Sequence, residues 1–436
     1  MNQFSELSLS TTIKANLARN GFIKPTPVQA EAIPAALAGR DLIATAQTGT
    51  GKTLAFALPI VEKLAAEKLA NKGPKGGVPP VQAVILSPTR ELAIQIHETF
   101  TKLAVGTGLQ AAIVVGGVNE GTQLRALRNG AQLVIATPGR LCDFLDRRLV
   151  NLSKTAFLVL DEADRMLDMG FLPSIKVILK TIPTERQTMF FSATMEKSVA
   201  HLVESHVKNP VRISIGATTK PAENVDLHLY EIDQTQKVGL LQHLLRVEQG
   251  SFLVFVRTKH GADRLADRLQ RSGLKAARIH GNRTQNQRNQ ALDLFKKGDY
   301  RVLVATDVAA RGIHVDSIGH VVNFDLPQIP EDFIHRIGRT GRAGARGSAA
   351  TFATRGERGD IRAIERQLGV KLSSKVVAAG DMVEEAANVP LPSKVVVLPT
   401  NNRRSFGSGN GNSSSNSENK RPAFHSKFSR RRSAGR

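Results

Sequence analysis

An eight-residue segment near the start of the chain has the composition of a phosphate-binding loop. Residues 46–53 read Ala-Gln-Thr-Gly-Thr-Gly-Lys-Thr and stand between an apolar run at 42–46 and a helical pattern. Small residues let backbone N–H groups close around phosphate oxygens at a helix N-terminus, where the helix dipole favours anions. Lys52 would reach the β- and γ-phosphates, and the Thr53 hydroxyl would bind Mg²⁺. Ala46 stands where this spacing usually has glycine, which is a small departure.

Two adjacent carboxylates follow another apolar run. Phe-Leu-Val-Leu at 157–160 leads into Asp161 and Glu162, and Ala163 and Asp164 come next. A carboxylate at a strand end beside a phosphate loop can hold Mg²⁺ through water, which is the role predicted for Asp161. Glu162 can orient and deprotonate an attacking water. The alternative is that these four residues only cap the next helix, and the upstream phosphate loop disfavours it.

A glycine-rich segment further on holds a histidine and three arginines. Residues 335–344 read His-Arg-Ile-Gly-Arg-Thr-Gly-Arg-Ala-Gly, so the arginines recur every three residues. Phosphoryl transfer needs positive charge on the transferred group, and glycines allow close approach to an anion. The segment therefore predicts a clamp for the γ-phosphate. A generic basic turn and a nucleic-acid patch are the alternatives.

The elements that must position these residues alternate between two kinds. Apolar runs of four to six residues are separated by longer helical patterns, which predicts an α/β fold with parallel sheets. The expected strands lie at 42–46, 83–87, 111–115, 133–136, 157–160 and 188–192, and then at 252–256, 276–279, 302–305 and 320–324. Small and polar residues at 216–224 predict a linker between domains at 1–215 and 225–370. Residues 371–399 are expected to form an extension of unclear structure.

The charge points to a polyanionic partner. The 436 residues include 60 Lys and Arg against 38 Asp and Glu, a net charge of +22. Residues 400–436 hold nine of these cations and one acid within Asn, Ser and Gly, which predicts a disordered basic tail that grips phosphate backbones. A purely solubilising tail is the alternative. A single cysteine excludes an internal disulfide, and the absence of a long apolar run or secretory signal predicts a cytoplasmic protein with no membrane partner.

Taken in order, the motifs resemble those of the DEAD-box ATP-dependent RNA helicases of superfamily 2, and within them the bacterial RhlE-like branch. The resemblance covers about residues 1–370, with a Q motif within 1–29. It implies two tandem RecA-like domains whose parallel sheets are flanked by helices, ATP and Mg²⁺ as cofactors, and an RNA-stimulated ATPase. Such an enzyme couples ATP hydrolysis to local unwinding of short RNA duplexes and to remodelling of RNA–protein complexes.

The resemblance also implies roles for individual residues. The ATP site would comprise Phe4, Phe22, Gln29, Ala46, Gln47, Thr48, Gly49, Thr50, Gly51, Lys52 and Thr53. The catalytic groups would be Lys52, Asp161, Glu162, Arg339 and Arg342, with Thr53 and Asp161 (via water) holding the metal. Hydrolysis would be coupled to strand separation through Asp164, Ser192, Thr194 and His335. The chain departs from the family at His314, where the usual residue is an aspartate that contacts the ATP ribose.

RNA would be held by its backbone, with little sequence preference. The implied contacts are Pro88, Thr89, Arg90, Gly116, Gly117, Thr137, Gly139, Arg140, Arg257, Gly281, Gln285, Arg288 and Thr306. These are Gly, Thr and Arg turns at strand ends, which suit phosphates and 2′-hydroxyls. Ribosomal precursors and the RNA-decay machinery stay open as partners. An ATP-gated RNA clamp or annealing chaperone and a DNA-directed helicase remain as alternative functions.

Overall fold

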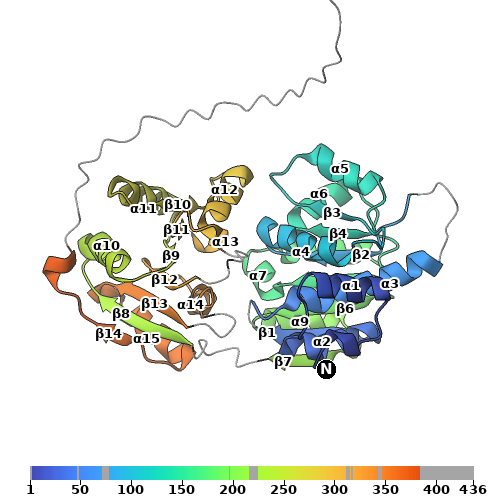
Figure 1. Cartoon of the computed structure of the whole chain (residues 1–436), viewed down its shortest axis with the longest axis horizontal. Helices are drawn as coiled ribbons and strands as arrows, with labels where there is room; N and C mark the ends of the chain where they lie inside the picture. Colours follow the sequence, from blue (N-terminus) through green and yellow to red (C-terminus); the bar gives the residue numbers. More distant parts are fainter. Residues whose placement is uncertain are drawn as a thin grey trace, which may run out of the picture. The chain divides into compact units, whose positions relative to one another are not determined.

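The computed structural model describes residues 2–46, 49–70, 78–195, 197–215, 224–310, 315, 318–341 and 346–382. Several predictions fall outside these ranges: the roles of Gln47, Thr48 and Arg342, the departure at His314, nearly all of the linker, the later part of the extension, and the basic tail. Within the described ranges the chain forms two seven-stranded sheets, and every strand pairing in them is parallel (Figure 1).

The first sheet has the strand order β3-β4-β2-β5-β6-β1-β7. Its strands are β1 Leu42–Ala46, β2 Ala83–Leu86, β3 Ala111–Val114, β4 Leu133–Ala136, β5 Phe157–Asp161, β6 Gln187–Ser192 and β7 Val211–Ile215. The helical elements of this half are η1 Phe4–Glu6, α1 Thr11–Arg19, α2 Pro27–Leu37, α3 Lys52–Ala70, α4 Arg90–Leu103, α5 Glu120–Arg128, α6 Pro138–Asp146, α7 Ala163–Asp168, α8 Leu172–Thr181 and α9 Lys197–His206.

The second sheet has the strand order β10-β11-β9-β12-β13-β8-β14. Its strands are β8 Val225–Glu231, β9 Phe252–Phe255, β10 Ala276–Ile279, β11 Val302–Ala305, β12 His320–Asn323, β13 Gly347–Ala353 and β14 Ser373–Lys375. The helical elements are η2 Gln234–Gln236, α10 Lys237–Val247, α11 Lys259–Arg271, α12 Gln285–Lys296, α13 Asp307–Ala310, α14 Pro330–Ile337, η3 Arg355–Glu357, α15 Arg358–Leu368 and η4 Ala379–Met382.

Each sheet is buried on both faces, because helices cover both sides of it. Ile85 and Val159 belong to one hydrophobic cluster of the first sheet, whereas Val84 and Leu158, their neighbours in sequence, belong to another. This follows from the alternation of side chains along a strand. The second sheet also has two clusters of its own. Continuous apolar runs, rather than alternating ones, are what such doubly covered parallel strands require.

All ten strands predicted from apolar runs are present, with ends that differ by at most one residue. Four strands were not predicted: β7, β8, β13 and β14. β7 and β14 are edge strands with exposed positions, β8 alternates polar and apolar residues, and β13 consists mainly of small residues. The second sheet also extends past residue 370, because β14 pairs with β8 through Ser373, Ser374 and Lys375.

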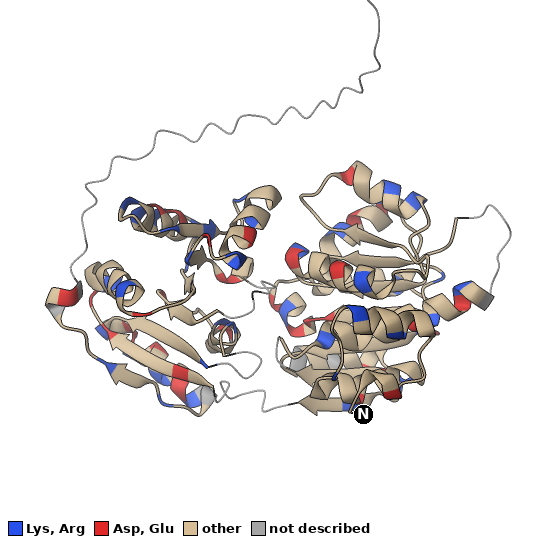
Figure 2. Ribbon diagram, viewed as in Figure 1, with Lys and Arg blue, Asp and Glu red and all other residues tan. Residues whose placement is uncertain are grey.

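Charged residues of both signs are spread over the helices of both halves (Figure 2). Within the described ranges, no helix combines the length and the apolar character needed to cross a membrane.

Candidate functional site

The phosphate loop joins β1 to α3. Gly49 and Gly51 have φ angles of +92° and +88°, in the left-handed region that favours glycine. A side chain on Gly51 would also collide with the amide of Gln29. Lys52, at the start of α3, is 5% exposed, and its Nζ donates a hydrogen bond to the Ala46 carbonyl at 2.8 Å. The ammonium group therefore lies inside the loop rather than in solvent.

A cavity of about 430 Å³ opens beside this loop, and we call it the nucleotide cavity after the predicted role of the loop. Its wall includes Gly49, Gly51, Lys52, Thr53, Asp161, Glu162, Gln29 and Phe22. The predicted phosphate loop, the two carboxylates and part of the Q motif thus face one space. Because these residues come from three separate segments of the chain, only the fold brings them together.

The Q motif is tied directly to the phosphate loop. Gln29 Nε2 donates to the Gly51 carbonyl at 2.9 Å, and its Oε1 accepts from the Thr26 N–H at 2.9 Å. The Thr26 hydroxyl donates to the Thr50 carbonyl at 2.7 Å. A side-chain amide has two donor hydrogens and two acceptor lone pairs, so Gln29 keeps one of each for a ligand. These hydrogen bonds join Thr26 and Gln29 to the backbone of the phosphate loop.

The two predicted aromatic contacts lie in different places. Among the described residues that line the nucleotide cavity, Phe22 is present and Phe4 is not. The Phe4 side chain is 3% exposed and packs into the core of the first half, where its N–H donates to the Ile23 carbonyl at 3.3 Å. Phe4 and Phe22 meet around a separate cavity of about 180 Å³. Phe22 thus lines both cavities, and Phe4 lines the smaller one.

Asp161 and Glu162 are both buried, yet their environments differ. Burial raises the pKa of Asp161 to about 7, although Lys52 opposes the rise. Burial alone would also raise the pKa of Glu162, but Arg165, Arg339 and Lys52 outweigh it and lower the value to about 2. Glu162 is therefore an ionised carboxylate at neutral pH. One of two neighbouring acids is held charged and the other is close to neutral, which suits two different roles.

Glu162 is held in an unusual backbone conformation. Its φ of +52° and ψ of +53° are left-handed, where a glutamate is uncommon, and it stands at the N-cap of α7. Its carboxylate lies 3.3 Å from Arg165 Nη1, with both side chains at most 5% exposed. The sequence motifs gave no role to Arg165. In the structure its guanidinium contacts the carboxylate of Glu162, the predicted base, and helps to keep that carboxylate ionised.

Asp164 connects α7 to the segment that follows β6. Its Oδ2 accepts hydrogen bonds from the Ala193 N–H at 3.0 Å, the Thr194 N–H at 2.9 Å and the Thr194 hydroxyl at 3.1 Å. Its own N–H donates to the Ser192 hydroxyl at 3.3 Å. Three of the four predicted coupling residues therefore form one hydrogen-bonded unit next to Glu162.

The described part of the histidine–arginine segment, residues 335–341, lies on α14 and just after it. Arg339 is close enough to Glu162 to lower its pKa, and His335 lies near the same carboxylate. Burial, with Arg165 nearby, lowers the pKa of His335 far below its usual value, so its imidazole is neutral. Arg336 plays a different part, because its guanidinium pairs with both oxygens of Asp307 at 2.6 and 2.7 Å and is 1% exposed. Of the three arginines, Arg336 is thus a buried link between α14 and α13.

The predicted RNA contacts of the first half gather at the carboxyl ends of its strands. Arg90 lies over Gly116 and Gly117, and a side chain on Gly117, whose φ is +72°, would collide with its guanidinium. The Thr89 hydroxyl caps α4 by accepting from the Leu92 N–H, and Pro88 is buried beside it. Thr137 is the N-cap residue of α6 but makes no side-chain capping hydrogen bond, Gly139 is exposed, and Arg140 follows.

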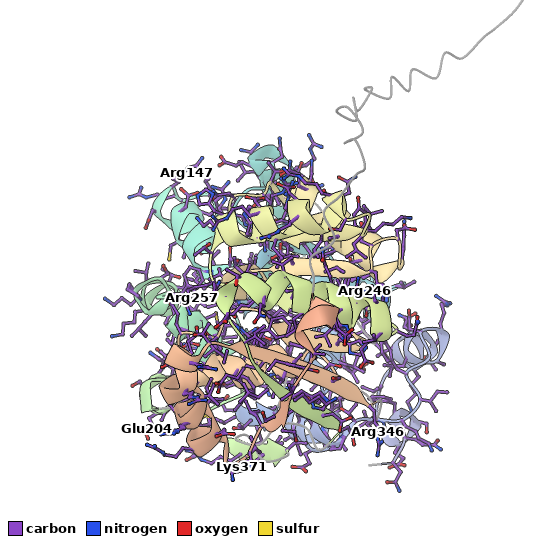
Figure 3. The ribbon with its side chains drawn as sticks, turned by 90° about the vertical axis from the view of Figure 1, so that its left-hand side faces the viewer. Arg147, Glu204, Arg246, Arg257, Arg346 and Lys371 are labelled. Atoms are coloured by element: carbon purple, nitrogen blue, oxygen red, sulfur yellow. The ribbon has the colours of Figure 1, made fainter. Side chains whose placement is uncertain are left out.

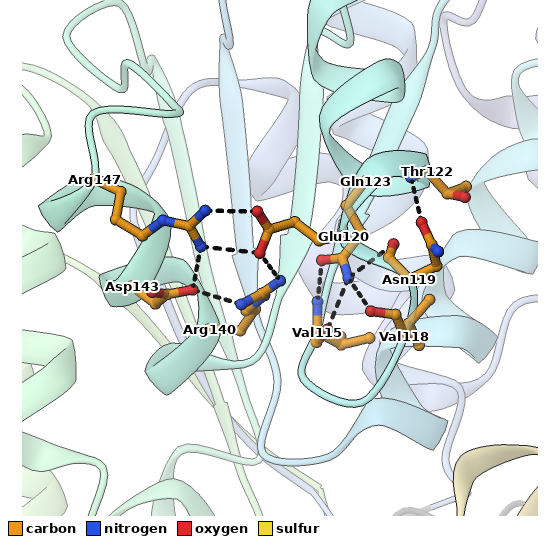
Figure 4. A network of polar contacts seen from close by, with 9 residues as sticks. All are labelled: Val115, Val118, Asn119, Glu120, Thr122, Gln123, Arg140, Asp143 and Arg147. Carbon is orange, nitrogen blue, oxygen red and sulfur yellow. Dashed lines mark hydrogen bonds and ion pairs between the residues drawn. The ribbon is translucent and has the colours of Figure 1, made fainter. Parts of the chain in front are cut away.

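Arg140 lies in a network of ion pairs that sequence motifs did not reveal (Figure 4). Its Nη2 is 2.8 Å from Glu120, and its Nη1 is 2.5 Å from Asp143. Arg147 shares Glu120 at 2.6 Å. On the same helix, α5, the buried Gln123 bonds both the N–H and the carbonyl of Val115 at 3.1 Å. The network therefore joins α5 and α6 to the loop that carries Gly116 and Gly117.

The predicted RNA contacts of the second half lie on the loops after β9, β10 and β11. Arg257 is half exposed, Gly281 is exposed, and Thr306 is buried at the start of α13. Gln285 and Arg288 on α12 both contact Glu91 of α4, at 2.8 Å from Gln285 Nε2 and 2.9 Å from Arg288 Nε. Two predicted RNA contacts of the second half thus meet a buried carboxylate of the first half, Glu91, which was not itself among the predicted RNA contacts.

The donor set fits a magnesium ion better than a softer metal. No group of three His, Cys, Asp or Glu side chains in the described ranges could hold a metal without a ligand's help. The Thr53 hydroxyl and the Asp161 carboxylate do line the same cavity. Mg²⁺ is usually bound by one or two protein oxygens together with water and phosphate oxygens. The cavity therefore suits Mg²⁺ that arrives with a nucleotide.

Comparison with known proteins identifies the family. Residues 26–202 match the DEAD/DEAH box helicase family model, and residues 236–344 match the helicase conserved C-terminal domain. DEAD-box ATP-dependent RNA helicase CshA of Bacillus licheniformis is 41% identical over 77% of this chain and 67% of its own length. CshA of Bacillus subtilis is 42% identical over 77% and 66%. The chain thus spans about two thirds of the length of these relatives.

Solved structures agree. The Dbp5 protein of S. cerevisiae, bound to RNA and ADP BeF3, matches with a TM-score of 0.75 and 30% identity over 86% of this chain and 96% of that one. Mss116p, bound to ssRNA and AMP-PNP, matches with a TM-score of 0.77 and 29% identity over 87% and 80%. Both the sequence motifs and the two parallel sheets are accounted for: this chain belongs to the family of DEAD-box ATP-dependent RNA helicases.

Proposed function

We propose that this protein hydrolyses ATP in a reaction that depends on RNA, and that it uses the cycle to open short RNA duplexes and remodel RNA–protein complexes. The observation that carries the proposal is the hydrogen-bonded unit of Asp164, Ser192 and Thr194 directly after Glu162. Because Asp164 is two residues from Glu162, a movement of Glu162 during hydrolysis would be passed through these hydrogen bonds to the segment after β6. RNA is supported as the partner by the RNA-bound relatives Dbp5 and Mss116p.

In the proposed hydrolysis each residue has a separate role. Lys52 neutralises the β- and γ-phosphates from inside the loop, and Gln29 and Phe22 hold the adenine. Glu162 stays ionised and orients the attacking water. As the water oxygen bonds to the γ-phosphorus, Glu162 accepts a proton from it, the bond from that phosphorus to the bridging oxygen breaks, and ADP leaves with that oxygen. Arg339, together with Arg342, places positive charge on the transferred group. Thr53 and Asp161 would hold Mg²⁺, which supplies charge neutralisation at the phosphate oxygens when it is bound.

The RNA contacts are proposed to line one groove that grips phosphates and 2′-hydroxyls. Two of them, Gln285 and Arg288, are attached to Glu91 of the other half. Binding of ATP and RNA to both halves would favour the arrangement in which Arg339 reaches the γ-phosphate, so ATP turnover would depend on RNA. The separate sheets and cores support two units joined by the linker, one at 1–215 and a second that begins at 225 and extends past 370 to β14. We place this activity in the cytoplasm.

The proposal is tested by measuring ATPase rates with and without single-stranded RNA, for the parent and for Glu162→Gln. The parent should hydrolyse ATP faster with RNA. Glu162→Gln should bind ATP and RNA but lose about 10²- to 10⁴-fold in kcat, which is the usual contribution of a general base. A parent rate that ignores RNA would refute the coupling, and normal turnover by the variant would refute the role of Glu162.

A further inference from the structure

A second cavity lies in the half of the chain that carries the second sheet. Its volume is about 620 Å³, and it shares no lining residue with the nucleotide cavity. Arg257, Arg264 and Arg268 contribute to its wall, and Leu265 and Phe324 contribute apolar surface. Figure 3 looks onto this side of the molecule, with Arg257 labelled beside α10. The cavity thus combines guanidinium groups with an aromatic ring.

The arginines follow one face of α11. Positions 261, 264, 265 and 268 all line the cavity, which is the spacing of a single helical face. Arg264 and Arg268 are exposed and lie one turn apart. The acids of the same helix serve another neighbour: Asp263 is 3.2 Å from Arg278 and 3.0 Å from His280, and Asp267 also pairs with Arg278. Helix α11 therefore presents its acids to β10 and its arginines to the cavity.

The carboxylates that line the cavity do not outweigh the positive charge of its arginines. Its carboxylates are Asp325 and Glu357, and Glu357 lies 3.6 Å from Arg257 Nη2. Both carboxylates also lie 3.9 Å from the buried Nζ of Lys237. Three arginines in the wall and a lysine behind it thus outnumber two acids. The cavity attracts an anion, and the Phe324 ring offers a surface for a planar group.

We infer that this cavity binds single-stranded RNA that flanks the segment held in the RNA groove. The inference rests on the proposed function, and continuity carries it: Arg257 is a predicted RNA contact, Thr258 caps α11, and the arginine face continues from there. Phosphates would lie on Arg264 and Arg268, and a base on Phe324. An acidic protein segment is the competing occupant, but it has no such continuity with the groove.

The experiment uses the full chain and two labelled RNAs. The short RNA is the shortest single strand that the parent binds in the presence of a non-hydrolysable ATP analogue, and the long RNA carries extra single-stranded residues at both ends. The test variant is Arg264→Gln with Arg268→Gln. The control, Arg362→Gln with Arg366→Gln, removes the same charge at the same spacing from exposed positions of α15. The parent and the control should bind the long RNA more tightly than the short one.

The test variant should lose that gain, by about three- to tenfold, and the slope of log affinity against log salt should fall by about 1.4 for two single-strand phosphate contacts. Its affinity for the short RNA and its ATPase rate with that RNA should stay within about twofold of the parent. Photocrosslinks from 4-thiouridine in the flanks should map to the cavity wall of the parent.

Three results would overturn the inference: a length gain that survives in the test variant, an equal loss for short and long RNA, or flank crosslinks that avoid the cavity. A cavity that crosslinks to no flank would point to a protein partner instead. An ATPase that ignores both RNAs would count against the proposed function, whereas the binding comparison would still decide whether the cavity holds RNA.

Discussion

At the scale of residues, the two neighbouring acids make opposite contributions to stability. The pKa of Asp161 is raised to about 7, whereas an unfolded aspartate titrates near about 3.9. Between these values the folded protein keeps a proton that the unfolded chain has lost, so stability falls as pH rises from about 4 to 7. Asp161→Asn removes this cost and keeps the Oδ1 atom that accepts from the Glu162 N–H.

The nucleotide-free Asp161→Asn protein should therefore be more stable than the parent at pH 8, by a free energy on the order of a few kcal/mol, and should unfold at a higher temperature. The difference should be about a third as large at pH 5 and should vanish below about pH 4. Thermal unfolding in EDTA measures this. Glu162→Gln is the matched comparison. The pKa of Glu162 is lowered to about 2, so its charge stabilises the fold above about pH 4.5, and that variant should be less stable than the parent at pH 8. Equal shifts in both variants would contradict this assignment.

The motif residues were predictable from sequence because phosphate loops and paired carboxylates are contiguous. Their supporting side chains were not. Arg165 is only three residues from Glu162, but nothing in the spacing shows that its guanidinium turns inward to a carboxylate. The left-handed conformation of Glu162 is likewise a property of the folded turn.

At the scale of elements, apolar runs located the buried strands well, because a strand covered on both faces needs an uninterrupted run. Strands that contain polar or small residues, such as β8 and β13, have no uninterrupted apolar run and were therefore not predicted. The sequence also did not show how helix α5 packs. Gln123 is an ordinary polar residue in the sequence, yet its side chain is 3% exposed and bonds the backbone of the loop that carries Gly116 and Gly117.

Gln123→Ala should therefore loosen the loop that carries Gly116 and Gly117. Backbone groups of Val115 and Val118 would lose their partner inside the protein, which should cost about 1–3 kcal/mol of unfolding free energy. The RNA concentration for half-maximal ATPase stimulation should rise several-fold, with kcat at saturating RNA nearly unchanged. Denaturant unfolding and RNA titrations measure both effects. Thr122→Ala, on an exposed position of the same helix, is the control. Unaltered RNA titration in Gln123→Ala would show that the loop does not contact RNA.

At the scale of the whole molecule, long-range pairs were the part that sequence could not supply. Glu91 and Arg288 are separated by 197 positions. Arg288 is a predicted RNA contact, and Glu91 directly follows another, Arg90. Their contact therefore joins the two halves beside predicted RNA-binding residues. Glu91 is 4% exposed, so the pair is shielded from solvent, and removing one partner would leave the other charge buried without compensation.

If this ion pair favours the arrangement that hydrolyses ATP, Glu91→Gln should lower the RNA-stimulated ATPase rate by about tenfold, because leaving the largely buried Arg288 charge without its partner costs about 1–3 kcal/mol. Arg288→Gln should do the same, and the double variant should lose little more than either single one. The ATPase rates of the four proteins at saturating ATP and RNA form the cycle, with Arg278→Gln, which removes an arginine paired within the second half, as the control. Additive losses would mean that Glu91 and Arg288 act separately on RNA, and that the ion pair between them does not contribute to turnover.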